Sequence, residues 1–151
     1  MSVLKDRINA DLKTAMIARD TVKTQTLQGL KSAILYEEVA KKLRETGLDE
    51  AQIEQVVARE AKKRDEAAEM FEKGGNAASA EKERTEKEIL NVYLPEQLGE
   101  DEILKIVKEV IADVKPDGVR DMGRVIGAVK AKVGNTADGA LVAKLVKESL
   151  Q

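Results

Sequence analysis

The spacing of the apolar residues is the feature that most constrains how this 151-residue chain can fold. They recur every three or four positions along almost the whole chain, and no segment shows sustained alternation of apolar and polar residues. The first spacing is typical of amphipathic helices and the second of strands. Only three residues are aromatic, so the core must be aliphatic, which suits helix-on-helix packing. We therefore expect an all-α, multihelical protein.

Four helices are predicted in residues 1–94. Each has a candidate capping residue before its first turn, and these are Ser2, Asp20, Asp49 and Asn76. Asp49 also has the spacing of a capping box with Gln52. We expect Gly47 to end the second helix and Gly74–Gly75 to end the third. The residues predicted to face the core are Leu4, Ile8, Leu12 and Met16, then Leu27, Leu30, Ile34 and Val39, then Ile53, Val56, Val57, Met70 and Phe71.

A break near Pro95 is predicted to separate two small helical bundles. Pro95 disfavours helical geometry at Leu94, so the fourth helix should end there. The apolar pattern restarts at Ile103, behind an acidic first turn, and three short helices follow. From Lys115 onward the sequence has seven basic and four acidic residues. We expect this excess of basic residues to distinguish the second bundle from the first. The predicted domains are residues 1–94, with four helices, and residues 95–151, with three.

The stretch DMGRVIGAVKAKVG, Asp121 to Gly134, has helical spacing but two interior glycines, Gly123 and Gly127. Each costs about 1 kcal/mol relative to Ala. Around a helix, the apolar residues share one side, and the other side is small and basic. Two interpretations are open: the glycines seat a neighbouring helix of the same bundle, or they leave a shallow surface for a partner.

Basic side chains accompany these glycines and are the candidate partner-binding residues. Arg120 and Arg124 are placed to reach phosphates, which would position a nucleic acid without reading its sequence. Lys130 and Lys132 lie alongside, and two residues of the last helix extend the patch, Lys144 and Lys147. This region has no aromatic side chain on which bases could stack, so recognition of a structured RNA by shape is favoured.

The chain has no Cys and no His, which excludes several classes of chemistry. Disulfides, thiolate nucleophiles, Cys/His zinc sites and Ser-His-Asp triads all need one of them. We predict no catalytic residue, no metal site and no cofactor. We interpret the charged cluster Arg59–Glu69 as a solvated helix face with a Glu60–Arg64 pair, and Glu81/Glu83 and Glu86/Glu88 as surface pairs.

The sequence favours a cytoplasmic location without membrane contact. Lys5 and Asp6 stand where a signal peptide would be apolar. No apolar run approaches the roughly 20 residues that a membrane-spanning helix requires.

Four segments, taken together and in this order, resemble the YqeY family, part of the GatB/YqeY group. They are LKSAI (Leu30–Ile34), EKEILNVYLPEQL (Glu86–Leu98), DMGRVIGAVKAKV (Asp121–Val133) and ADGALVAKLVK (Ala137–Lys147). The resemblance covers essentially the whole chain and implies a two-part helical module. It also implies kinship to the C-terminal helical region of the B subunit of the glutamine-dependent aspartyl/glutamyl-tRNA amidotransferase, a carbon–nitrogen ligase. In that enzyme this region helps to hold the tRNA, and the kinase and amidase chemistry lie elsewhere.

The resemblance further implies which residues of this tail face RNA: Gly123, Arg124, Gly127, Lys130, Lys132, Asp138 and Gly139. We expect a helical module, without catalysis of its own, that binds tRNA, another structured RNA or a tRNA-handling protein. One alternative is a protein-interaction adaptor with no RNA, and another is an accessory to tRNA transamidation. An RNA-binding module should carry basic residues beside the glycines, whereas an adaptor should expose an apolar patch.

Overall fold

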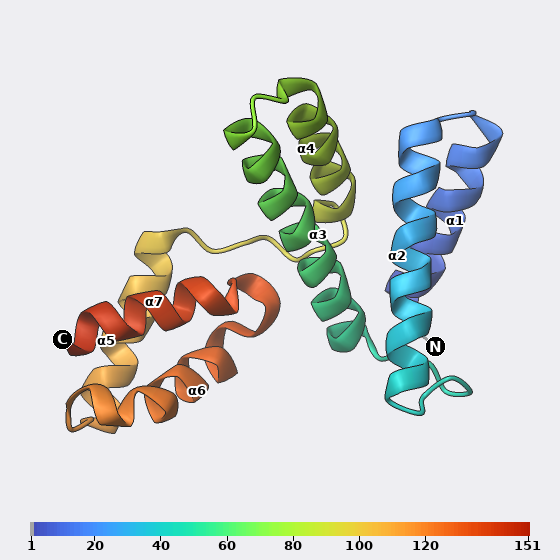
Figure 1. The fold of residues 1–151 in the computed structure, drawn as a ribbon. Coiled ribbons are helices and arrows are strands. Elements are labelled where there is room, and N and C mark those ends of the chain that lie inside the picture. The colour runs from blue at the N-terminus through green and yellow to red at the C-terminus, as the bar shows by residue number, and fades with distance from the viewer. Residues whose placement is uncertain (1) are drawn as a thin grey trace. The chain divides into compact units, whose positions relative to one another are not determined.

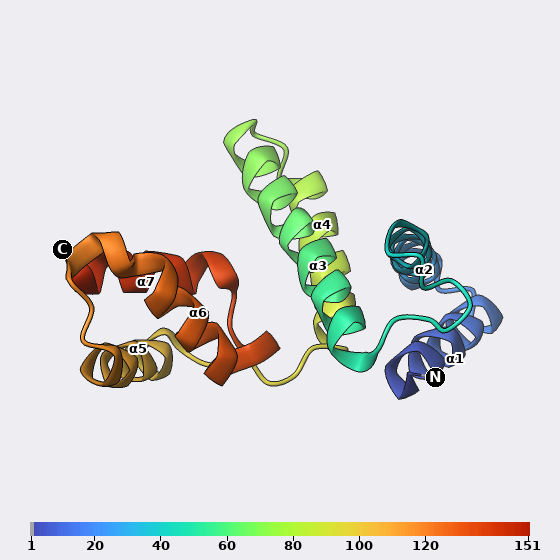
Figure 2. The same cartoon turned by 90° about the horizontal axis from the view of Figure 1, so that it is seen from below.

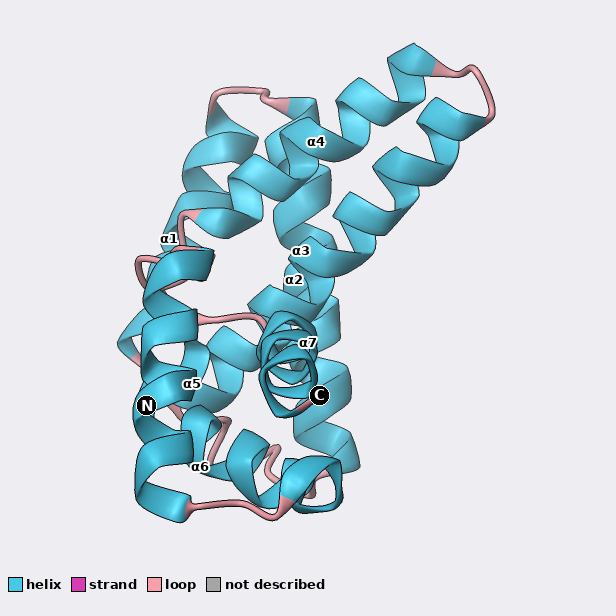
Figure 3. Cartoon of the chain, turned by 90° about the vertical axis from the view of Figure 1, so that its left-hand side faces the viewer, coloured by secondary structure: helices cyan, strands magenta, loops and turns pink. Residues whose placement is uncertain are grey.

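The computed structural model describes residues 2–151. These residues contain seven α-helices and no strand, which confirms the prediction of an all-α fold (Figure 3). The chain divides into two compact units, Met1–Leu94 and Pro95–Gln151. No helix within the described part of the chain combines the length and apolarity needed to span a bilayer.

The first unit consists of two helical hairpins (Figure 1). Its helices are α1 (Val3–Ile17), α2 (Thr21–Ala40), α3 (Glu50–Lys73) and α4 (Ala77–Asn91). Figures 1 and 2 show α4 beside the C-terminal part of α3, while the start of α3 extends beyond the end of α4. The four predicted caps are confirmed, because each side chain accepts a hydrogen bond from the backbone N–H three residues further on. The capping box of Asp49 and Gln52 is also present.

The core of the first unit lies where α1, α2 and the first half of α3 pack against one another. Its largest fully buried side chains are Ile8, Leu27, Leu30, Ile53 and Leu90. Tyr93, just after α4, is also buried, and its hydroxyl donates a 2.6 Å hydrogen bond to Asp11 of α1. The guanidinium of Arg7 lies 5.0 Å from the centre of the Tyr93 ring. Tyr93 thus ties the end of α4 to α1.

Four residues predicted to be buried are exposed. The exposed fractions are 54% for Met16, 54% for Val39, 74% for Met70 and 37% for Phe71. These residues lie near the ends of their helices, where the apolar stripe continues but no other helix covers it. At the end of α2 the buried position belongs instead to Glu38, which forms a 2.7 Å ion pair with Lys5.

Gly47 does not end α2, contrary to prediction. The helix ends at Ala40, and a loop with positive φ at Lys42 (58°) and Gly47 (79°) leads to α3. The prediction that Gly74–Gly75 ends α3 is confirmed, since the helix stops at Lys73 and Gly75 has a φ of 79°.

The charged cluster on α3 is partly solvated, and some of its residues also form ion pairs with neighbouring helices. Arg64 pairs with Glu86 of α4 at 3.2 Å, and Arg59 pairs with Glu37 of α2 at 3.2 Å. The predicted Glu60–Arg64 pair is therefore wrong. A charged stripe on one helix does not reveal that a second helix offers a better partner across the interface.

The prediction that the acidic residues of α4 form only surface pairs also needs correction. Glu83 is half-buried beside Glu86, three residues further along α4, and not beside the predicted Glu81. Burial, and then the charge of Glu86, raise the pKa of the Glu83 carboxyl, while Arg64 opposes this shift. By contrast, hydrogen bonds from Ser2 and from the Leu4 backbone lower the pKa of Glu50 at the start of α3.

The second unit is a bundle of α5 (Glu100–Val114), α6 (Met122–Val133) and α7 (Gly139–Leu150), and each helix contacts the other two. The helix predicted between Asp121 and Gly134 is confirmed, and so is its end at Gly134. The buried core is aliphatic throughout and consists of Ile103, Val107, Val110, Val125, Val129, Val133, Val142, Leu145 and Val146.

The basic excess that begins at Lys115 does not distinguish the second unit from the first. Residues 95–151 contain nine basic and ten acidic side chains, and residues 1–94 contain seventeen and eighteen. The contrast lies inside the second unit, where an acidic α5 packs against the more basic pair of α6 and α7.

Candidate nucleic-acid interface

The candidate interface begins on the outer side of α6. Val125, Val129 and Val133 are buried against α5 and α7, so the opposite side of the helix faces away from the bundle core. Gly123 and Gly127 are both exposed there, one helical turn apart. The structure therefore places the two glycines on an outer face, with one arginine, Arg124, beside them.

Neither glycine is required by packing within the chain. A Cβ atom added to Gly123 or Gly127 would meet no atom of the described residues within 4 Å outside its own helix. Both have ordinary helical conformations, without the positive φ that favours glycine. The interpretation that they seat a neighbouring helix of the same bundle is therefore wrong, because α5 and α7 pack on the opposite side.

The two arginines have local carboxylate partners. Arg120 lies in a short 3-10 turn, Gly118–Asp121, and pairs with Asp117 at 3.3 Å. Arg124, in the first turn of α6, pairs with Asp121 at 3.3 Å. Both arginine side chains are more than half exposed, so water weakens these pairs. The aspartates nevertheless reduce the positive potential near the start of α6.

The four candidate lysines are exposed and form no salt bridge with the described residues: Lys130, Lys132, Lys144 and Lys147. The structure brings Lys130 to the start of α7, where its Nζ lies 3.4 Å from the place that a Cβ of Gly139 would occupy. Lys144 and Lys147 lie on the exposed side of α7, on a different helix from the glycines. Asp138 is the N-cap of α7, and its side chain accepts a hydrogen bond from the Ala140 N–H.

Hydrogen bonds between segments distant in sequence fix the loop between α6 and α7. The Leu98 N–H donates to the Thr136 carbonyl at 2.8 Å, and the Gln97 side-chain amide donates to the Asn135 carbonyl at 3.0 Å. Neither contact has a local sequence signal, because each joins the linker after Pro95 to a loop nearly forty residues later. They hold the start of α7 in place beside Lys130.

The second unit exposes little apolar surface. Val119 is the one large apolar side chain that is exposed in residues 95–151, all of which the structure describes, and its exposed fraction is 43%. The outer face of α6 therefore consists of glycine backbone and charged side chains. Such a surface suits a polar, anionic partner better than an apolar one.

The fold and this face define a class: an all-α protein of two helical units whose C-terminal bundle presents a basic, glycine-containing helix. Comparison with family models assigns the chain more narrowly. The model of the YqeY-like protein family matches residues 5–150, and the chain therefore belongs to that family. Comparison with curated proteins gave no match.

Proposed function

We propose that this YqeY-like protein is a helical module that binds tRNA, or another structured RNA, through the outer face of α6 and the neighbouring lysines, without catalysing a reaction itself. The resemblance to the tail of the tRNA amidotransferase B subunit supports RNA as the partner class.

The observation that carries the proposal is the open space at Gly123 and Gly127. Two interior glycines cost a helix about 2 kcal/mol relative to alanine. Since no contact among the described residues requires their small size, a close approach by another molecule is the simplest reason to retain them. A sugar–phosphate backbone would bring anionic oxygens to this surface.

The charges support an RNA phosphate backbone over a protein partner at this face. Lys130, Lys132, Lys144 and Lys147 can pair with phosphates without first breaking a salt bridge. A tRNA-handling protein or an adaptor partner at this face would be favoured by an exposed apolar patch in residues 95–151, and Val119 alone does not form one.

Binding of a tRNA transcript, measured by filter retention across a salt series, tests the proposal. Three or four phosphate contacts predict a log–log salt slope of about −3. Lys132→Glu with Lys144→Glu should abolish binding at moderate salt and leave the helical circular dichroism spectrum unchanged. Lys108→Glu, an exposed charge reversal on α5, is the matched control and should bind nearly as the wild type does.

Side chains of different size introduced at Gly127 test whether the open surface is needed for binding. Gly127→Ala should stabilise the protein by about 1 kcal/mol, and Gly127→Leu should fold but lose tRNA binding because its side chain fills the approach. A wild-type protein that binds no tRNA even at low salt would contradict the proposal. So would a Gly127→Leu variant that binds as tightly as the wild type.

A further inference from the structure

The outer face of α2 carries a patch of apolar residues that no other helix of the first unit covers. Leu35, Tyr36 and Val39 have exposed fractions of 47%, 77% and 54%. The buried side of this helix, which includes Leu30 and Ile34, already supplies the core. Three large apolar side chains within two turns are therefore available to a partner, and one of them is a tyrosine, a residue type enriched at binding hot spots.

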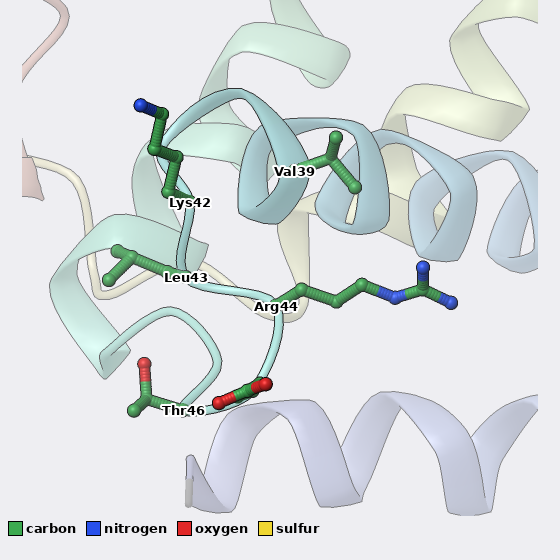
Figure 4. A pocket seen from close by; sticks show the side chains of 6 residues that line it. Val39, Lys42, Leu43, Arg44 and Thr46 are labelled. Carbon is green, nitrogen blue, oxygen red and sulfur yellow. The ribbon is translucent and has the colours of Figure 1, made fainter.

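A shallow hollow continues this patch beyond the end of α2 (Figure 4). It is present because α2 stops at Ala40 and the chain turns back in a loop with a positive φ at Lys42. Val39 and Leu43 supply its apolar lining, and its remaining lining residues are Lys42, Arg44, Glu45 and Thr46. Figure 4 shows the Arg44 side chain extending back along the last turns of α2, whereas the Lys42 side chain points the other way.

Unpaired cations flank the patch at both ends. Lys31 lies one turn before Leu35, and Lys42 and Arg44 follow the helix. None of the three forms a salt bridge with the described residues. Glu37 is the nearby carboxylate on α2, and both Lys41 and Arg59 pair with it. The loop also contributes one carboxylate to the hollow, Glu45, so the three cations without a salt bridge outnumber it around the patch.

We propose that this face, Leu35–Tyr36–Val39 with the hollow at Leu43 and Arg44, docks an amphipathic, acidic helix of another protein. The apolar side of such a helix would cover Tyr36 and Val39, and its carboxylates would reach Arg44 and the lysines. This docking surface is in the first unit and uses none of the residues proposed to contact RNA. Its failure and the failure of RNA binding are therefore distinguishable.

Charge and polarity argue against the other occupants. A second copy of the chain, docked through the same face, would bring Lys31, Lys42 and Arg44 against their own counterparts. An RNA would satisfy the cations and could stack on Tyr36, but it offers no apolar group to Leu35 and Val39. A carboxylate-bearing amphipathic helix satisfies both the charges and the apolar residues.

The test is selection by the full-length protein from a phage-displayed library of 18-residue amphipathic helices, in which the polar positions are randomised between Glu and Lys. We expect enrichment of Glu-rich helices that keep their apolar stripe. An enriched peptide, synthesised with a fluorescent label, should bind to the wild type in an anisotropy titration. Tyr36→Ala should weaken its binding at least about thirtyfold, the minimum expected at a hot spot. Arg44→Glu should weaken it and shift the preference towards Lys-rich helices.

Matched controls on α1 separate docking from folding. Ile17→Ala removes an equally exposed apolar side chain, and Lys13→Glu reverses an exposed charge. Both should leave peptide affinity unchanged. Three results would overturn the proposal: no enrichment over the Tyr36→Ala protein, enrichment of Lys-rich helices by the wild type, or a dimer in sedimentation that Tyr36→Ala dissolves. Loss of tRNA binding in Tyr36→Ala with peptide binding intact would instead indicate an RNA surface.

Discussion

The hairpin of α3 and α4 and the bundle of α5, α6 and α7 use different interactions to hold their helices together. Between α3 and α4 the fully buried residues are mainly alanines, Ala61, Ala68 and Ala80, and ion pairs such as Arg64–Glu86 and Lys87–Asp65 join the two helices. In the bundle the contacts are made by valine, leucine and isoleucine, and the ion pairs of its two arginines are local.

The comparison shows two ways to stabilise helices without aromatic residues. Alanine brings two helix backbones close but buries little apolar area, so the hairpin relies on charges that water and salt can weaken. Branched aliphatic residues bury more area per residue, and salt does not screen their contribution as it screens an ion pair. The hairpin should therefore respond to salt and pH, and the bundle to the loss of methyl groups.

The largest expected loss of folding stability follows from a substitution in the core of the bundle of α5, α6 and α7. Ile103→Ala, at a fully buried position of α5, should cost about 2–5 kcal/mol, which is comparable to the stability of a unit of this size. Hydrogen exchange followed by mass spectrometry should show lost protection in residues 95–151 and retained protection in α1 and α2. Val119→Ala, which shortens an exposed side chain, should leave the protection of both units unchanged. Equal loss of protection in both units would mean that they do not unfold separately.

Overpacking the hairpin should have the next largest effect. Ala80 is fully buried on α4, and Ala80→Leu should push the helices apart at a cost of about 1–3 kcal/mol. Urea unfolding monitored by circular dichroism measures the change. Ala78→Leu, on the exposed side of the same helix, is the control and should be nearly neutral. A stable Ala80→Leu variant would show that this interface has spare volume.

Removing the cation between the helices should cost less. Arg64→Gln leaves Glu83 and Glu86 beside each other without their shared positive neighbour, and we expect a loss of about 1–2 kcal/mol at low salt. The loss should shrink in 1 M salt, where screening weakens the repulsion. Lys13→Gln on α1 serves as the control. A loss that does not depend on salt would indicate packing by the arginine stem instead.

The smallest effect concerns pH. Because the folded-state pKa of Glu83 is raised, folding favours its protonated form. This contribution is fully present below the ordinary pKa of a glutamate and is lost as the pH rises through the folded value. Relative to Glu83→Gln, the wild type should therefore gain stability in urea titrations as the pH falls from 7 towards 4.5.

Glu50 provides the control of opposite sign for this titration. Its pKa is lowered in the fold, so its contribution is present above the ordinary value and is lost as the pH falls through the folded value. Glu50→Gln should destabilise the protein most at neutral pH and least in acid. Parallel pH profiles for the Glu83 and Glu50 variants would contradict the assigned shifts.

The local features of the fold could be predicted from sequence. Caps such as Ser2, Asp20 and Asn76 depend on contacts within four residues, and each is found where it was predicted. The break at Pro95 depends on a steric clash with the preceding residue, and α4 ends shortly before it. These predictions needed no knowledge of which helices are neighbours.

Predictions that depend on neighbouring helices were less reliable. Met70 and Phe71 continue an apolar stripe, but the far end of α3 has only α4 beside it, so they remain exposed. Glu38 is buried because Lys5, on another helix, reaches it. At the candidate interface the sequence identified Gly127 as unusual, but only the positions of α5 and α7 show that its surface is open.

The contact between Tyr93 and Asp11 has a spectroscopic consequence. The chain has no tryptophan, and its two tyrosines lie in the first unit, Tyr93 buried and Tyr36 exposed on the α2 face. Burial and the hydrogen bond to Asp11 raise the pKa of the Tyr93 phenol, so its phenolate absorbance should develop only when α4 separates from α1. Tyrosine emission thus reports on the first unit alone, and the second has no ultraviolet fluorophore of its own. A single tryptophan introduced there would give each unit its own optical signal.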